Sequence, residues 1–268
     1  MITQHRIASG GTTLVADIAG QGMPVIFLHA AVCDSRMWQA QLAGPPPGCM
    51  AIAYDRRGFG RTPADVEPFS AVADLMAVMD ATAGGRPAVL VGCSAGGRIA
   101  LDAALLHPGR IRALVLIAPS VSGAPDPVYP PDIAAMVARS QAIEASGDTA
   151  RLAAAKARLW LDGPIADEGR VGDGARSLFL EMQAGIRPAG PDRDAAGAHD
   201  RLDEIAAPAL VIQGDLDFPH IQARSRYVAA AMPGAVHQPF AGSAHLPSLE
   251  YPRQITDRIA GFIAGLPT

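Results

Sequence analysis

Four continuous apolar runs constrain the fold of this chain more than any other feature of its sequence. The runs are 24–30, 49–55, 87–93 and 111–119. They lack the polar alternation of a strand with one solvated face, so they resemble strands that are buried on both faces. Segments with helical spacing lie between them, at 35–43, 70–83 and 95–107. An early strand at 12–19 and a last helix at 252–266 are also expected. Strands that alternate with helices predict an α/β fold, with a mainly parallel sheet flanked by helices.

The alternation of strands and helices is interrupted in the middle of the chain. Residues 120–207 contain a proline-rich stretch and several helical stretches, but no convincing buried strand. Strand patterns return at 208–215 and 235–240. We therefore predict a core formed by residues 1–119 and 208–268, with a helical cap inserted at 120–207.

The composition argues against several classes of function. A net charge of -4 over 268 residues provides no basic face for nucleic acid, and only 5% of the residues are aromatic. The three cysteines show neither a zinc-binding spacing nor a disulfide framework, which is typical of a reducing compartment. The sequence has no signal-peptide pattern and no apolar run near the ~20 residues of a membrane helix. We expect a cytoplasmic protein that binds neither nucleic acid nor membranes.

The sequence Gly92-Cys93-Ser94-Ala95-Gly96 matches G-x-S-x-G at a junction between an expected strand and an expected helix. In this context the turn is tight, the backbone of Ser94 is strained, and its hydroxyl projects over the carboxyl edge of the sheet. The helix that begins at Ala95 directs its free N–H groups toward the same place. The motif predicts a nucleophile at Ser94. The alternative is a plain glycine-rich turn in which Ser94 caps the helix.

A serine hydroxyl needs a base to act as a nucleophile at neutral pH. Among seven histidines, His245 follows the last expected strand, and its loop belongs to the same sheet edge as Ser94. His107 ends the helix after Ser94, about 19 Å of helical rise away, which excludes it. His220 is the competitor, although it more naturally opens a helix. Chain order and position favour His245 as the base.

The acid that orients the base is expected in the loop after 208–215. Asp215 and Asp217 both lie close enough to the strand end to reach the base, so spacing alone leaves both open.

Together, the strand order, the Ser94 turn, the acid loop and the terminal histidine resemble the α/β-hydrolase superfamily. The resemblance covers about residues 10–120 and 205–265. In that family's G-x-x-D loop the acid stands three residues after the glycine, which implies Asp217 here.

The resemblance also implies two donors for a developing oxyanion, the N–H groups of Ala95 and Ala31. Where the family usually has His-Gly-x, this chain has His29-Ala30-Ala31. Ala30 is therefore a departure, because alanine resists the positive φ that glycine adopts. His29 is expected to hold this loop by hydrogen bonds. The stretch "YDRRGFGRT", which ends at Thr62, also matches a family pattern and is expected to be a structural loop.

Within this superfamily, the stretch "DSRMW" and the short cap look similar to those of small carboxylesterases and 3-oxoadipate enol-lactonases. This resemblance implies a serine hydrolase that cleaves a small ester or lactone. Such an enzyme needs no metal and no organic cofactor. The expected partner is the small-molecule substrate, and a homodimer stays open. A carbon–carbon bond hydrolase, a cofactor-free perhydrolase and a non-catalytic ligand-binding homologue are alternatives with the same triad. Epoxide and haloalkane hydrolases are disfavoured, because those relatives have aspartate where this chain has Ser94.

The expected cap carries apolar residues that could line an acyl pocket, among them Trp160, Phe179 and Met182. The alternative for each is that it packs a cap helix onto the core. Arg176, Arg187 and Arg193 are candidates for holding a substrate carboxylate, but isolated arginines on a polar segment are usually solvated.

Overall fold

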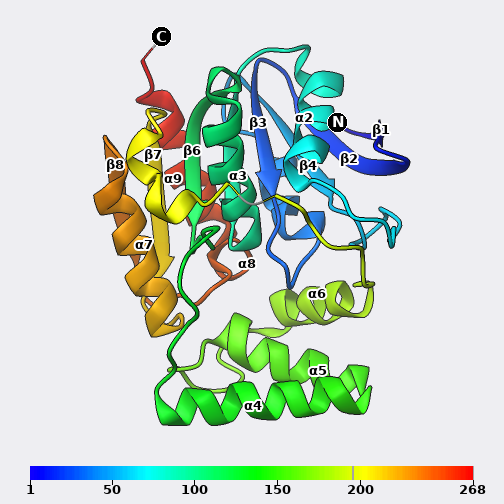
Figure 1. The fold of residues 1–268 in the computed structure, drawn as a ribbon, viewed down its shortest axis with the longest axis vertical. Coiled ribbons are helices and arrows are strands. Elements are labelled where there is room, and N and C mark those ends of the chain that lie inside the picture. Colours follow the sequence, from blue (N-terminus) through cyan, green and yellow to red (C-terminus); the bar gives the residue numbers. More distant parts are fainter. Residues whose placement is uncertain (195, 268) are drawn as a thin grey trace.

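One sheet organises the chain, with its strands in the order β1-β2-β4-β3-β5-β6-β7-β8 (Figure 1). This computed structural model describes residues 1–194 and 196–267. The strands are β1 Ile2–Ser9, β2 Thr12–Gly20, β3 Met23–Leu28, β4 Cys49–Asp55, β5 Ala88–Cys93, β6 Ile111–Ile117, β7 Ala209–Gly214 and β8 Ala235–Phe240. β2 pairs antiparallel with β1 and with β4, and the other neighbours are parallel. The predicted α/β fold with a mainly parallel sheet is confirmed.

Helices follow most of the strands. The α-helices are α1 Gln39–Ala43, α2 Ala71–Ala83, α3 Ala95–Leu106, α4 Pro131–Ser146, α5 Thr149–Lys156, α6 Asp173–Ala184, α7 Pro219–Ala231, α8 Pro247–Glu250 and α9 Pro252–Ala264. Shorter turns are the 3-10 segments η1 Ser35–Trp38, η2 Pro108–Arg110, η4 Ala198–Asp200 and η5 Leu202–Glu204, and the π-helical segment η3 Ala157–Asp162. No described helix combines the length and the apolar character that crossing a bilayer requires.

The central strands are buried on both faces because their alternating residues enter two different cores. Ile26 and Leu28 of β3 pack with the side chains of α2 and α3. Val25 and Phe27 point the other way and pack with Trp38 and with α9. The side chains on both faces of these strands are apolar, which explains why their sequences are continuous apolar runs.

The stretch between β6 and β7 contains α4, α5, η3 and α6. In Figure 1 these helices lie together below the sheet, on the side toward which the arrows of β3 and β7 point. That side is the carboxyl edge, where loops of a parallel sheet carry functional residues. The helices fall within the segment 120–207 that the sequence predicts as a cap. Residue 195 of that segment and residue 268 of the predicted core lie outside the described residues.

Candidate active site

Ser94 occupies the sharp turn between β5 and α3. Its backbone is at φ 54° and ψ -115°, a positive φ that a residue with a side chain rarely adopts. The Ser94 N–H donates to the carbonyl of Ile117 on β6 (3.0 Å), which fixes the turn to the sheet. The predicted backbone strain at Ser94 is confirmed, and its side chain is half-buried rather than enclosed.

Two glycines make this turn possible. A Cβ atom on Gly92 would lie 2.5 Å from the carbonyl oxygen of Gly96. A Cβ atom on Gly96 would lie 2.2 Å from the carbonyl oxygen of Leu28 on β3. No larger residue fits at either place, so the start of α3 packs directly against the neighbouring backbone.

His245 and Asp217 form a buried hydrogen-bonded pair at the same edge of the sheet. His245 lies in the loop between β8 and α8, and its Nδ1 is 2.8 Å from Oδ2 of Asp217. The other oxygen of Asp217 accepts from the N–H of Phe218 (2.7 Å). Both side chains are almost fully buried. A proton on Nδ1 is fixed by the carboxylate, which leaves the lone pair of the ring on Nε2, as a general base requires.

The competing residues, Asp215 and His220, take no part in the hydrogen bond of this pair. Asp215 is exposed, and its carboxylate accepts from the N–H of Gly242 (2.7 Å), so it caps a turn. His220 lies in the first turn of α7. Burial and the nearby Arg224 lower the pKa of His220 to about 4. The prediction that His220 opens a helix is confirmed.

Ser94 is linked to the His245–Asp217 pair through its neighbour. The thiol of Cys93 donates to the carbonyl oxygen of His245 (3.6 Å). Among the described residues, no hydrogen bond joins Ser94 itself to His245. Catalytic hydrogen bonds are often long or misaligned until substrate is bound.

The loop after β3 carries the two alanines that replace the expected His-Gly-x pattern. Among the described residues, positive φ outside glycine occurs at Ser94 and Ala118, so Ala30 has an ordinary backbone conformation. The carbonyl of Ala30 accepts from the N–H of Cys33 (3.2 Å). The departure from glycine therefore causes no strain here. Ala31 is exposed and Ala95 half-buried.

His29 holds this loop in place. Its Nδ1 is 2.8 Å from the carbonyl oxygen of Ala30, and its Nε2 accepts from the N–H of Arg56 (3.1 Å). Burial, together with the charge of Arg56, lowers the pKa of His29 to about 3. The ring is therefore neutral at pH 7 and has the structural role that the sequence predicts.

The loop after β4 is also structural. The hydroxyl of Thr62 donates to the carbonyl of Asp55 (2.7 Å) and accepts from the N–H of Val15 on β2 (3.0 Å). Arg57 donates two hydrogen bonds to Asp74 on α2, from Nε at 2.8 Å and from Nη2 at 2.9 Å. These contacts join the loop to the sheet and to α2.

Of the three predicted pocket residues, the structure brings one to the His245–Asp217 pair. The ring centroid of Trp160, in η3, is 4.7 Å from that of His245 and 4.7 Å from that of Phe218. Phe179 and Met182 of α6 are fully buried in the core. Phe179 and Met182 therefore pack α6 onto the core, which is the expected alternative to lining a pocket. Phe218 was missed, although it directly follows the acid, because one apolar residue in a loop carries no signal of its own.

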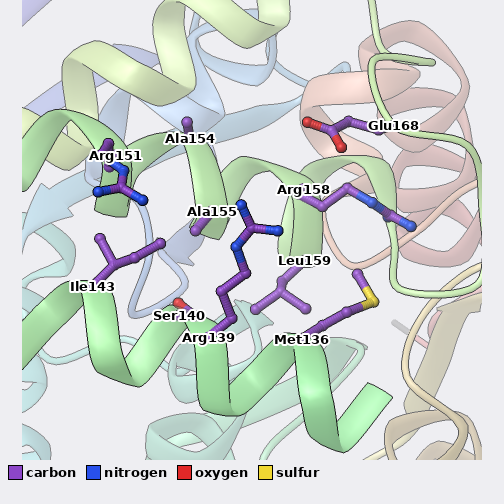
Figure 2. A pocket seen from close by; sticks show the side chains of 10 residues that line it. All are labelled: Met136, Arg139, Ser140, Ile143, Arg151, Ala154, Ala155, Arg158, Leu159 and Glu168. Atoms are coloured by element: carbon purple, nitrogen blue, oxygen red, sulfur yellow. The ribbon is translucent and has the colours of Figure 1, made fainter. Parts of the chain in front are cut away.

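A separate cavity of about 460 Å³ is lined by residues of α4, α5 and η3. Figure 2 shows Arg139, Arg151 and Arg158 around it, with Met136 and Leu159 at one end. Leu159 also belongs to the apolar cluster that includes Phe218. The cluster therefore adjoins both this cavity and the aromatic group next to His245.

Comparison with known proteins places the chain in a family of hydrolases. Residues 25–258 match the model of the alpha/beta hydrolase family. An epoxide hydrolase from Caballeronia sordidicola is 36% identical over 42% of this chain, and the match spans only 36% of that protein. A pimeloyl-[acyl-carrier protein] methyl ester esterase from Aromatoleum aromaticum is 27% identical over 90% of this chain and 98% of its own length.

Solved structures agree on the fold. A thermophilic esterase from Thermogutta terrifontis superposes with a TM-score of 0.80 over 99% of this chain and 100% of its own, at 22% identity. The family model matches most of the chain, and the sharp turn at Ser94 and the mainly parallel sheet agree with it. The chain therefore belongs to the alpha/beta hydrolase family.

Proposed function

We propose that this protein is a serine hydrolase that cleaves a small carboxylic ester or lactone through an acyl-enzyme on Ser94. The observation that carries the proposal is the buried hydrogen bond between His245 Nδ1 and Asp217 Oδ2. A neutral histidine oriented in this way is suited to remove a proton from a hydroxyl at neutral pH.

The first half of the reaction forms the acyl-enzyme. His245 Nε2 accepts the Ser94 proton while Ser94 Oγ attacks the carbonyl carbon of the substrate. The N–H groups of Ala31 and Ala95 stabilise the negative charge on the carbonyl oxygen, and Asp217 stabilises the imidazolium. The tetrahedral intermediate then collapses, and His245 donates its proton to the departing alkoxide.

The second half regenerates the enzyme. His245 removes a proton from water, which attacks the acyl carbon, and the proton then returns to Ser94 Oγ as the carboxylic acid leaves. A lactone reacts by the same steps, except that its alkoxide stays attached to the acyl group. No step needs a metal or an organic cofactor.

The side chain at the elbow favours an ester over an epoxide. Epoxide-hydrolysing relatives are expected to have an aspartate at this position, where this chain has Ser94. The relative from Aromatoleum aromaticum, which aligns over 98% of its length, is an esterase, and this supports the same class of substrate.

Active-site labelling tests the proposal. The protein should react with a fluorophosphonate probe and hydrolyse p-nitrophenyl butyrate, and Ser94→Ala should lose both the label and at least three orders of magnitude in kcat. Ser70→Ala, which removes the cap of α2, is the matched control and should keep both.

Three results would contradict the proposal. Labelling of Ser94→Ala would exclude Ser94 as the nucleophile. Labelling at Ser94 without turnover of any ester or lactone would favour a carbon–carbon bond hydrolase or a perhydrolase. Absence of both reactions would favour a ligand-binding homologue.

A further inference from the structure

A second cavity, of about 210 Å³, lies beside the loop after β4. We call it the Arg56 cavity. It is lined by Tyr54, Arg56, Arg57, Phe59, Phe69, Ala71, Asp74, Arg98, Ala189, Gly190 and Asp192. Its wall combines two phenylalanine rings with three guanidinium groups and two carboxylates. The charges of this wall decide what the cavity can bind.

Two of the three arginines are neutralised by the carboxylates. Arg57 forms its two hydrogen bonds with Asp74. Arg98 pairs with Asp192 and also with Asp102 (2.9 Å). Asp192 in addition accepts from the N–H of Ala71 (3.2 Å). Each lining carboxylate is therefore hydrogen-bonded through both of its oxygens to groups other than Arg56.

Arg56 is the lining arginine that none of the described ion pairs includes, although the charge of nearby Asp192 acts on it. The described ion pairs include its neighbours Arg57 and Arg61 but not Arg56, and its buried Nε has no hydrogen-bond partner. Its guanidinium lies 4.6 Å from the ring centroid of Phe59. Burial lowers the pKa of Arg56 to about 10, which still leaves it charged at pH 7.

The neighbouring His29 does not accept a hydrogen bond from the guanidinium of Arg56. Arg56 Nη2 lies 3.3 Å from His29 Nδ1. His29 Nε2 accepts from the Arg56 N–H, so the proton of this neutral ring is on Nδ1 and is directed to the carbonyl of Ala30. A protonated Nδ1 cannot accept from a guanidinium. Within residues 1–194 and 196–267, the guanidinium of Arg56 therefore has no hydrogen-bond acceptor.

Tyr54 supplies a second unpaired donor in the same wall. It is 1% exposed, and its hydroxyl has no hydrogen-bond partner among the described residues. Burial raises the pKa of Tyr54, so the hydroxyl keeps its proton. A buried hydroxyl without a partner is costly, so a ligand oxygen that accepts from Tyr54 and Arg56 together would be stabilised by both donors.

The Arg56 cavity lies close to the proposed nucleophile. Arg98, which lines it, follows Ser94 by one turn of α3, about 6 Å along the helix axis, and its N–H donates to the Ser94 carbonyl (3.1 Å). His29, which contacts Arg56, directly precedes Ala30 and Ala31. A group bound in this cavity therefore sits near the oxyanion donors.

We propose that the Arg56 cavity binds a free carboxylate of the substrate, so that the ester or lactone is derived from a dicarboxylic acid. A planar guanidinium and a hydroxyl provide donors that match the two oxygens of a carboxylate. This inference rests on the function proposed above, because its turnover experiment uses ester substrates. Its binding experiment does not depend on that function.

Turnover of matched substrates is the first test. Monomethyl adipate and methyl hexanoate have acyl chains of equal length and differ only in the terminal carboxylate. The wild-type protein should prefer monomethyl adipate, and Arg56→Met should lower the ratio of the two kcat/KM values about 10- to 100-fold. Tyr54→Phe should lower the ratio by a smaller factor, about 2- to 10-fold. Monomethyl succinate and monomethyl suberate extend the series to other lengths.

A matched arginine provides the control. Arg253 is exposed, lies in α9 and does not line the Arg56 cavity. Arg253→Met makes the same change in net charge and should leave the ratio unchanged. Equal losses in Arg56→Met and Arg253→Met would overturn the proposal, because they would indicate a general electrostatic effect.

Binding without turnover is the second test. Adipate should raise the melting temperature of Ser94→Ala and hexanoate should not, and the effect should vanish when Arg56→Met is added. Absence of stabilisation by adipate, succinate and suberate in Ser94→Ala would overturn the proposed site. Stabilisation that depends on Arg56, in a protein that hydrolyses no ester, would uphold the carboxylate site and refute the serine hydrolase.

Discussion

At the scale of single residues, the position of Asp217 relative to Asp215 decides how His245 is used. Asp217 is buried against His245, while Asp215 is exposed and caps a turn. Asp217→Asn should lower kcat on p-nitrophenyl butyrate about 10³- to 10⁴-fold, because an amide no longer fixes the histidine tautomer or stabilises its charge. Asp215→Asn is the control and should stay within about twofold. A large loss in Asp215→Asn alone would reverse the assignment of the acid.

The same residues show what the sequence can and cannot predict about the site. The strained turn was predictable because glycines flank Ser94 at a strand–helix junction. Spacing alone permits both aspartates of one loop, whereas the family resemblance implied Asp217, which the structure places against His245. Arg56 and Arg57 are adjacent and chemically identical, yet Arg57 pairs with Asp74 while none of the described ion pairs includes Arg56. Which arginine is paired depends on tertiary contacts that no local pattern encodes.

At the scale of elements, the sequence predicts every described strand except β1. β4 and β8 have the predicted bounds of 49–55 and 235–240, and β3, β5, β6 and β7 differ by one or two residues at their ends. β1 was missed because most of its side chains are exposed and it has no apolar periodicity. Its backbone is stabilised by antiparallel pairing with β2, which is a tertiary contact. Residues 148–161 have the spacing of one helical stretch within the segment 120–207, and the structure divides them into α5 and the π-helical η3.

One ion pair joins the segment between η3 and α6 to α8, which follows the loop of His245. Arg170, between η3 and α6, pairs with buried Glu250 of α8 (2.5 Å) and donates to the carbonyl of Gly242 (3.2 Å). Glu250 in turn accepts from Ser243 (2.9 Å) and from the N–H of Ala244 (3.0 Å), directly before His245. Burial raises the pKa of Glu250, and Arg170 opposes that rise.

Removal of Arg170 should therefore affect both stability and catalysis. Arg170→Met leaves the carboxylate of Glu250 buried without a counter-charge, which should cost about 3 to 5 kcal/mol in urea unfolding. It should also lower kcat, because the loop of His245 loses its support. Adding Glu250→Gln to Arg170→Met should restore part of the stability, since a neutral amide still accepts from Ser243 and Ala244. A double variant less stable than Arg170→Met would contradict this account.

At the scale of the whole molecule, the pH dependence of stability follows from buried groups that stay neutral. His29 is fully buried, and its pKa falls from 6.5 to about 3 on folding. Below pH 6.5 the unfolded chain binds a proton at His29 while the folded protein does not until about pH 3. The stability that this histidine contributes is therefore present above pH 6.5 and is lost as the pH falls from 6.5 toward 3. The pKa values of His220 and His237 are also lowered, so they add to the loss in the same direction.

Urea unfolding at pH 7 and pH 5 can isolate the share of His29. One buried histidine with this shift should cost about 2 kcal/mol between pH 6.5 and pH 5. His29→Gln removes the proton-binding group, so its free energy of unfolding should fall less between the two pH values, by about that amount. His107→Gln changes an exposed histidine at the end of α3 and should keep the wild-type difference. An equal fall in the free energy of unfolding of His29→Gln and His107→Gln between pH 7 and pH 5 would contradict this account. The proton taken up on unfolding would then bind to groups other than His29, and His29 would not be the neutral histidine that holds the loop of Ala31.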